Sequence, residues 1–137
     1  MNKSTNFSGT PIIKQILQFI LPSDVSRTAE KHSSDRYYKK FKTYDHLVTM
    51  IYATLSGVSS LRELSSIFLA CEGPISHLNM EYFPKRSTIS DANKNRSSAV
   101  FAEIYAVLYK RYASFLSDSS TGLPSIFVTN FVRPLCS

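Results

Sequence analysis

Apolar side chains recur every three or four positions along most of this chain, which is the spacing of one face of an α-helix. Such faces predict helices over residues 10–20, 43–55, 60–71 and 97–116. A shorter, more polar helix is predicted over residues 23–31. No alternation of apolar and polar residues before residue 120 is long enough to predict a strand. The chain is therefore expected to be all-α.

Several helix ends carry their own signals. Ser60 and Glu63 have the spacing of a capping box, in which each side chain bonds to the other residue's backbone N–H. Gly57 stands where a glycine commonly ends a helix. Thr43 is expected to cap the helix that follows it. The residues before it, 32–42, are expected to form a loop or a ragged basic extension.

The stretch from Pro84 to Arg96 departs from the amphipathic pattern. After Pro84, Ser87 is expected to cap a short helix whose one large apolar side chain is Ile89. Such a helix gains little by packing, so its other side chains are expected to face outward and to contact phosphates and base edges. These side chains are Ser87, Thr88, Ser90, Asn93, Lys94 and Arg96. The alternative is a solvated connector between two core helices.

The helix over residues 60–71, an irregular connection and the polar helix over residues 87–96 resemble a loosened helix-turn-helix. The connection is much longer than the usual turn of about three or four residues. The predicted architecture is therefore a compact multi-helix domain that contains this helix-turn-helix-like unit. An irregular C-terminal tail is expected to follow it.

Positive charge is concentrated in two segments. The chain has 16 Lys and Arg residues against 10 Asp and Glu residues, a formal net charge of +6. Residues 27–42 and 85–96 carry the whole excess, and a polyanion is the usual partner of such a pattern. Tyrosines and a phenylalanine are interleaved with the cations of the first segment. The alternative for that segment is a solvated basic loop with tyrosines packed beneath it.

The pattern of cysteines and histidines predicts neither a disulfide framework nor a metal site. Cys71 and Cys136 suit a reducing cytosol. Zinc needs clustered ligands, and although Cys71 and His77 stand close in sequence, His32 and His46 are far from them. A cytoplasmic, nucleoid-associated protein is expected.

Other chemistries also lack their signatures. The apolar stretch near the N-terminus is interrupted by Lys14, Gln15 and Gln18, so it predicts neither a signal peptide nor a membrane span. The 4 glycines form no phosphate-binding loop, and no nucleophile stands beside a base. We expect no catalytic residue, no metal, no cofactor and no small-molecule substrate.

Three blocks resemble the N-terminal domain of bacterial insertion-sequence DDE transposases of the IS-four type. They are YYKKFKTYDHLVTMIY at 37–52, LSGVSSLREL at 55–64 and FPKRSTISDAN at 83–93. The resemblance covers about residues 5–118. It implies a helical domain that binds the terminal inverted repeats of a transposon. In the family, a catalytic domain with an RNase H-like fold and three acidic metal ligands follows directly.

The chain departs from this family after residue 118. Residues 119–137 contain no acid and read as a truncated or out-of-frame tail, the alternative being a strand at 126–128. The expected organisation is a DNA-binding domain over residues 1–118 and the tail over 119–137. Without the catalytic domain the chain is expected not to be an enzyme.

These observations combine into one expected function, binding of double-stranded DNA at transposon ends. Phosphate contacts are expected from Lys85, Arg86, Lys94 and Arg96. Groove contacts are expected from Ser87, Thr88, Ser90 and Asn93, with Asn93 the best candidate for a bidentate contact to adenine. A second, mostly non-specific phosphate surface is expected from Arg36, Lys39, Lys40 and Lys42. The alternatives are a protein-interaction module that associates with itself or with full-length transposase, and an inert pseudogene product.

Overall fold

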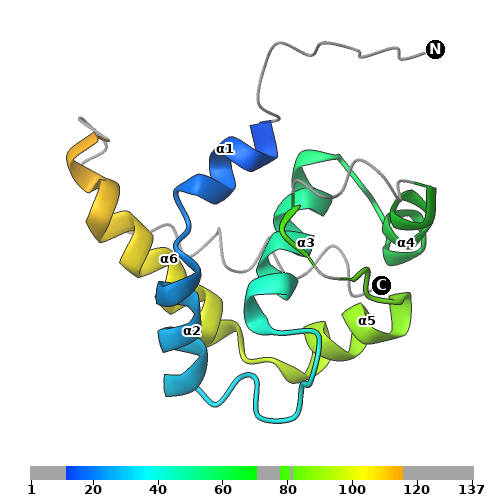
Figure 1. The fold of residues 1–137 in the computed structure, drawn as a ribbon, viewed down its shortest axis with the longest axis horizontal. Coiled ribbons are helices and arrows are strands. Elements are labelled where there is room, and N and C mark those ends of the chain that lie inside the picture. The colour runs from blue at the N-terminus through cyan, green and yellow to red at the C-terminus, as the bar shows by residue number, and fades with distance from the viewer. Residues whose placement is uncertain (1–11, 71–77, 81, 116–137) are drawn as a thin grey trace.

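The computed structural model describes residues 12–70, 78–80 and 82–115. Within these residues the secondary structure is helical, without strands, so the all-α prediction is confirmed for this part of the chain. The helices are α1 (Ile12–Gln18), α2 (Pro22–Lys31), α3 (Thr43–Leu55), α4 (Leu61–Ala70), α5 (Arg86–Asn95) and α6 (Ser98–Tyr112), and the 3-10 turn η2 (Ala113–Phe115) follows α6 (Figure 1).

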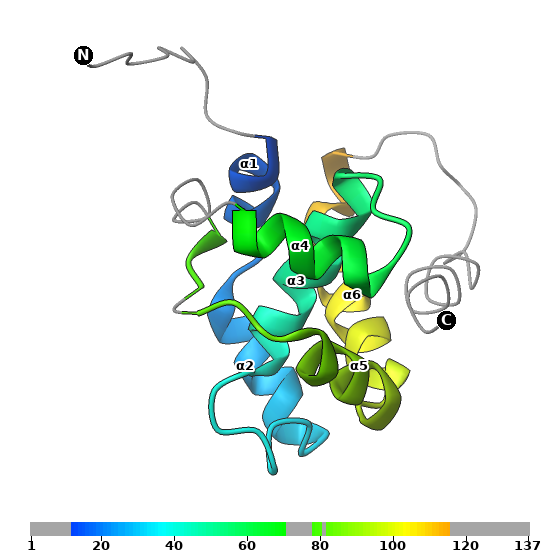
Figure 2. The same ribbon diagram turned by 90° about the vertical axis from the view of Figure 1, so that its right-hand side faces the viewer.

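Helix α3 lies at the centre of the domain. Helices α1 and α2 both pack against α3, α2 also packs against α6, and α4 packs against α5. Figures 1 and 2 show α3 between the α2–α6 pair and the α4–α5 pair. The core draws on every part of this arrangement, and its largest fully buried apolar side chains are Val25, Phe41, Val48, Met50, Leu64, Phe68, Leu78, Ile89 and Val100.

The end of α3 follows from a single glycine. Gly57 has a φ of +66°, a conformation that costs other residues energy. It allows the Gly57 N–H to donate to the Thr54 carbonyl at 3.3 Å and the Val58 N–H to donate to the Ala53 carbonyl at 3.1 Å. This pair of bonds is a Schellman motif, and the predicted helix end is confirmed.

The predicted capping box at the start of α4 is present, with one residue of offset. The Glu63 N–H donates to the Ser60 hydroxyl at 3.2 Å, as expected. The Glu63 carboxylate accepts from the backbone N–H of Ser59, at 3.0 Å, rather than from that of Ser60. Helix α6 has an ordinary cap, because the Ser97 hydroxyl accepts from the Ala99 N–H at 3.2 Å.

Two predicted caps were wrong. Thr43 is the first residue of α3 and is fully buried, and its N–H donates to the Asp35 carboxylate at 2.7 Å. A carboxylate from the preceding loop thus does what a cap side chain would do. Helix α5 begins at Arg86, before Ser87, and Lys85 holds its N-cap position without a side-chain hydrogen bond.

Helices α4 and α5, which the sequence assigns to the helix-turn-helix-like unit, pack against each other, and their long connection contributes to the core through Leu78, which is 1% exposed. Among the described residues, no helix has the length and apolar character needed to cross a bilayer. The expected tail over 119–137, including its alternative strand at 126–128, lies outside the described residues.

Replacing Gly57 tests the helix end directly. A Cβ at this position would meet no atom within 4 Å, so the cost of Gly57→Ala is conformational alone. We expect a loss of about 1 kcal/mol in the free energy of unfolding, measured by urea denaturation. Gly57→Asn is the control and should lose less, since asparagine tolerates this conformation better. Equal losses would contradict the account.

Candidate nucleic-acid interface

Helix α5 has a buried face and an exposed face. Ile89 and Ala92 are completely buried and attach the helix to the core. The opposite face is a polar stripe with helical spacing, in which all four side chains are exposed: Ser87, Ser90, Asp91 and Lys94. Lys85 and Arg86 are exposed at the start of the helix. The outward face is therefore cationic at both ends, with one acid between them.

Most side chains predicted to contact DNA from this segment are exposed, namely Lys85, Arg86, Ser87, Ser90 and Lys94. Thr88 is half-buried. For Asn93 and Arg96 the predicted outward orientation was wrong, because their exposed fractions are 8% and 7%. In this arrangement Asn93 does not present its amide to a base edge, and Arg96 does not stand on the surface.

The burial of Asn93 and Arg96 has a signal in the sequence. Counted from Ile89, they fall at the fourth and seventh following positions, which place them on the same helical face as Ile89. The spacing thus indicates the inward face. It does not supply the polar partners that make the burial tolerable, and these come from distant parts of the chain.

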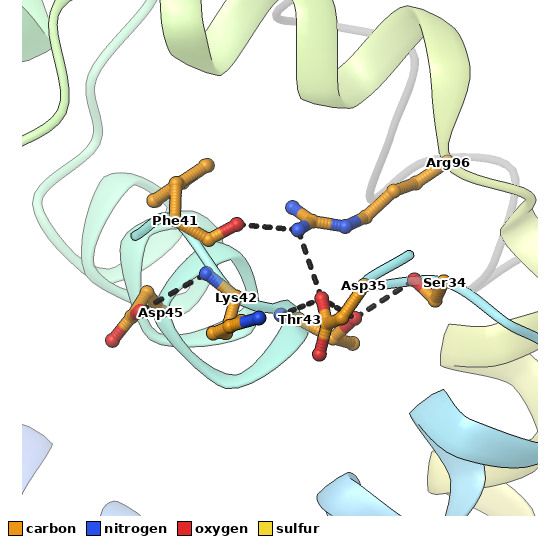
Figure 3. Close-up of polar contacts among 7 residues, drawn as sticks. All are labelled: Ser34, Asp35, Phe41, Lys42, Thr43, Asp45 and Arg96. Carbon is orange, nitrogen blue, oxygen red and sulfur yellow. Dashed lines mark hydrogen bonds and ion pairs between the residues drawn. The ribbon is translucent and has the colours of Figure 1, made fainter. Parts of the chain in front are cut away.

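Arg96 connects α5 to the loop of residues 32–42, which we call the basic loop. One guanidinium nitrogen, Nη2, donates to the Asp35 carboxylate at 3.1 Å and to the Phe41 carbonyl at 2.5 Å (Figure 3). The guanidinium carbon lies 4.0 Å from the centre of the Tyr38 ring, a cation–π contact. Burial lowers the Arg96 pKa and the Asp35 charge opposes that shift. The guanidinium stays charged at neutral pH.

Asp35 extends this connection to α3. Its Oδ1 atom accepts from the Thr43 N–H at 2.7 Å and from the Thr43 hydroxyl at 2.8 Å, besides the bond from Arg96. The Ser34 and Thr43 hydroxyls lie 2.8 Å apart (Figure 3). One carboxylate therefore joins the basic loop, the first residue of α3 and the residue that follows α5.

A second polar pair joins α3 to α5. The Nε2 atom of His46 lies 2.6 Å from the Asn93 amide oxygen, so His46 is the donor when it carries its proton on Nε2. The His46 ring packs edge-on against Phe101. Burial lowers the His46 pKa from 6.5 to about 4, although the hydrogen bond with Asn93 opposes the shift. His46 is consequently neutral at pH 7.

The cations of the basic loop remain at the surface, namely Arg36, Lys39, Lys40 and Lys42. Phe41, which is 2% exposed, anchors the loop between them. Because Arg96 bonds to Asp35 and Phe41, the C-terminal end of α5 and this loop lie together (Figure 1). The structure thus brings together the two basic segments that the sequence separates.

Not every cation near this region is free. Lys31 lies 2.6 Å from the Glu103 carboxylate, and His32 lies 2.5 Å from the same group. The hydrogen bonds from Lys31 and His32 hold the Glu103 pKa below its ordinary value. Asp24 and Arg111 form another ion pair between α2 and α6. Within the described residues, no group of three or more histidines, cysteines and carboxylates has the arrangement of a metal site.

Comparison with known proteins adds a family and nothing on activity. Residues 8–81 match the family DUF4372, described as a domain of unknown function. No curated protein and no solved structure matches the chain. The matched segment contains Asp35, Thr43 and His46 but ends before α5. The polar contacts of Asn93 and Arg96 therefore link the matched segment to the cationic helix beyond it.

The pair between His46 and Asn93 should contribute to stability. Asn93→Ala leaves a buried donor on His46 without its acceptor, and we expect a loss of about 1–3 kcal/mol in the free energy of unfolding. Asn95→Ala is the matched control, because Asn95 is exposed on the same helix. It should change stability by less than about 0.5 kcal/mol. Urea denaturation of both variants measures the difference, and equal effects would contradict this role for Asn93.

Acid should destabilise the fold through His46. The folded protein holds the His46 pKa at about 4, below the 6.5 of an ordinary histidine, so the unfolded chain binds the proton first as pH falls. The contribution of His46 to the free energy of unfolding is therefore fully present above pH 6.5. It decreases toward pH 4, by about 3 kcal/mol in all. His46→Gln cannot titrate and should flatten this dependence. Unfolding measured between pH 7 and pH 4.5 on both proteins would contradict the account if the two slopes were the same.

Proposed function

The chain belongs to the DUF4372 family, and we propose that it binds double-stranded DNA through the exposed face of α5 and the basic loop. The observation that carries the proposal is the joining of two exposed cationic segments by one buried contact, that of Arg96 with Asp35. Cations at the ends of a polar helix beside a cationic loop suit a duplex, whose phosphates dominate affinity.

The exposed side chains divide into two roles. Lys85, Arg86 and Lys94 contact phosphates and set the position of α5 on the duplex. Ser87 and Ser90 lie on the stripe between them, and their hydroxyls contact base edges where α5 lies close in the groove. The first turn of α5 contains no acid, so the partial positive charge of the helix terminus adds to that of Lys85 and Arg86.

Asn93 and Arg96 do not have the surface roles that the sequence predicted, which were a base contact for Asn93 and a phosphate contact for Arg96. Both side chains are buried, and both contact groups of the same chain. Through these contacts they position α5 and the basic loop relative to each other. The basic loop supplies the second set of phosphate contacts, through Arg36, Lys39, Lys40 and Lys42.

The resemblance to transposase N-terminal domains narrows the DNA target. It points to the terminal inverted repeats of a transposon as the cognate duplex, bound in the cytoplasm. This part of the proposal rests on the three sequence blocks at 37–52, 55–64 and 83–93. The first block includes Lys39, Lys40 and Lys42 of the basic loop, and the last includes Lys85 and Arg86 at the start of α5.

A protein-interaction role is the second candidate, and exposed apolar side chains favour it. Leu69 is 77% exposed, Ile12 71% and Phe19 56%. Such side chains suit association with a second copy or with full-length transposase. The two candidates differ in their response to salt, since phosphate contacts weaken as salt rises while apolar association does not.

The double variant Lys85→Ala with Arg86→Ala tests the DNA proposal. Loss of two phosphate contacts should weaken binding to every duplex and lower the salt slope by about one to two units, at about 0.9 per contact. The matched control is Lys14→Ala with Lys110→Ala, which removes the same charge from exposed positions on α1 and α6. Fluorescence anisotropy at several salt concentrations, on an inverted repeat and a scrambled duplex, measures both quantities.

The control variant decides how the result is read. An unchanged slope for the control and a reduced slope for the α5 variant support the proposed interface. Equal reductions in the two variants would mean that only net charge matters and would remove α5 as the contact surface. Binding that is insensitive to salt would favour the interaction role instead.

A further inference from the structure

A hollow of about 420 Å³ lies beside the C-terminal end of α5. Its lining includes hydroxyl and amide groups from three segments: Ser33 and Ser34 of the basic loop, Asn95 of α5, and Ser97 before α6. Arg96 and Tyr38 also line it. None of the described residues that line it is acidic. The chemistry of the lining is therefore that of a site for a negatively charged group.

Arg96 lines this hollow and has hydrogen-bonding capacity left over. Its side chain is 1% exposed, and only Nη2 bonds, to Asp35 and to the Phe41 carbonyl. The N–H groups on Nε and Nη1 are buried and have no hydrogen-bond partner among the described protein atoms. Buried donors on a charged group are costly when unpaired. An acceptor within the hollow would remove that cost.

The N-terminal end of α6 adds to the positive electrostatic potential in the hollow. Ser97 is the N-cap of this helix of 15 residues, and no acid stands in the first turn. The positive end of the helix dipole therefore lies at a residue that lines the hollow. Helix N-termini and arginine together favour oxyanions, and phosphate offers several oxygens to several donors at once.

We infer that this hollow binds a phosphate group, with the Nε and Nη1 atoms of Arg96 as its charged donors. The inference rests on the proposed function in one respect, because a duplex backbone is taken as the source of the phosphate. Free inorganic phosphate has the same chemistry and is the simplest probe. Both nitrogens are closed off from solvent in this structure, so binding includes a local rearrangement that opens them to the hollow.

The variant Asn95→Asp tests the site without removing Arg96. Asn95 is exposed and lines the hollow, so the substitution places a carboxylate where the phosphate would bind. Asn79→Asp makes the same chemical change at an exposed position that is not part of the lining. Thermal unfolding, followed by circular dichroism, is measured with increasing inorganic phosphate and with sodium chloride at matched ionic strength.

The expected result is selective. Phosphate, and not chloride, should raise the Tm of the parent protein and of Asn79→Asp, and the rise should saturate as a single site fills. Asn95→Asp should show no such rise. On duplex DNA it should bind about tenfold more weakly than Asn79→Asp, the order expected for one lost charge-assisted contact.

Each other outcome has a definite meaning. If phosphate raises no Tm, the hollow holds water and the inference is wrong, whatever the duplex result. If phosphate acts as expected while the two variants bind duplex equally, the phosphate site stands and the DNA backbone is wrong as its source. If no protein binds duplex but the phosphate effect persists, the proposed DNA function fails and the anion site does not.

Discussion

The contact between Arg96 and Asp35 is the interaction on which the arrangement of the cationic surface depends. A buried charge is stable only when it is paired and its donors find acceptors. Arg96 meets that requirement through Nη2, which bonds to Asp35 and to the Phe41 carbonyl of the basic loop, and Asp35 also accepts from Thr43 at the start of α3. The path of the loop, the start of α3 and the end of α5 are therefore linked through one ion pair.

Helix α5 has two faces with different tasks. Its apolar contribution to the core is small, chiefly Ile89 and Ala92, so polar pairs do much of the positioning. A helix rotated by one residue would separate Asn93 from His46 and Arg96 from Asp35, leaving buried groups without partners. These pairs therefore define which side of α5 faces solvent. The side they leave exposed carries Ser87, Ser90 and Lys94.

The fold decides which of the cations in the sequence stay exposed at the surface. Lys31 counts toward the positive excess of the sequence, yet in the structure it pairs with Glu103 of α6. Arg96 also counts toward that excess and is buried against Asp35. Within α5 and the basic loop, the exposed cations lie at the ends of the helix and along the loop. The surface available to a polyanion thus has fewer cations than the composition indicates. The buried Arg96, which no longer belongs to that surface, positions the segments that form it.

The sequence by itself determined the helices and several of their ends. Apolar spacing predicted most of the helices, and Gly57 and Ser60 marked boundaries because their signals act through neighbouring backbone atoms. The spacing of Asn93 and Arg96 from Ile89 also contains a signal for a shared face, although the prediction placed both side chains outward. Only the tertiary structure decided that they are buried, because their partners, His46 and Asp35, stand 47 and 61 residues away. No local pattern records a partner at such a distance, and a polar side chain without one would have remained in water.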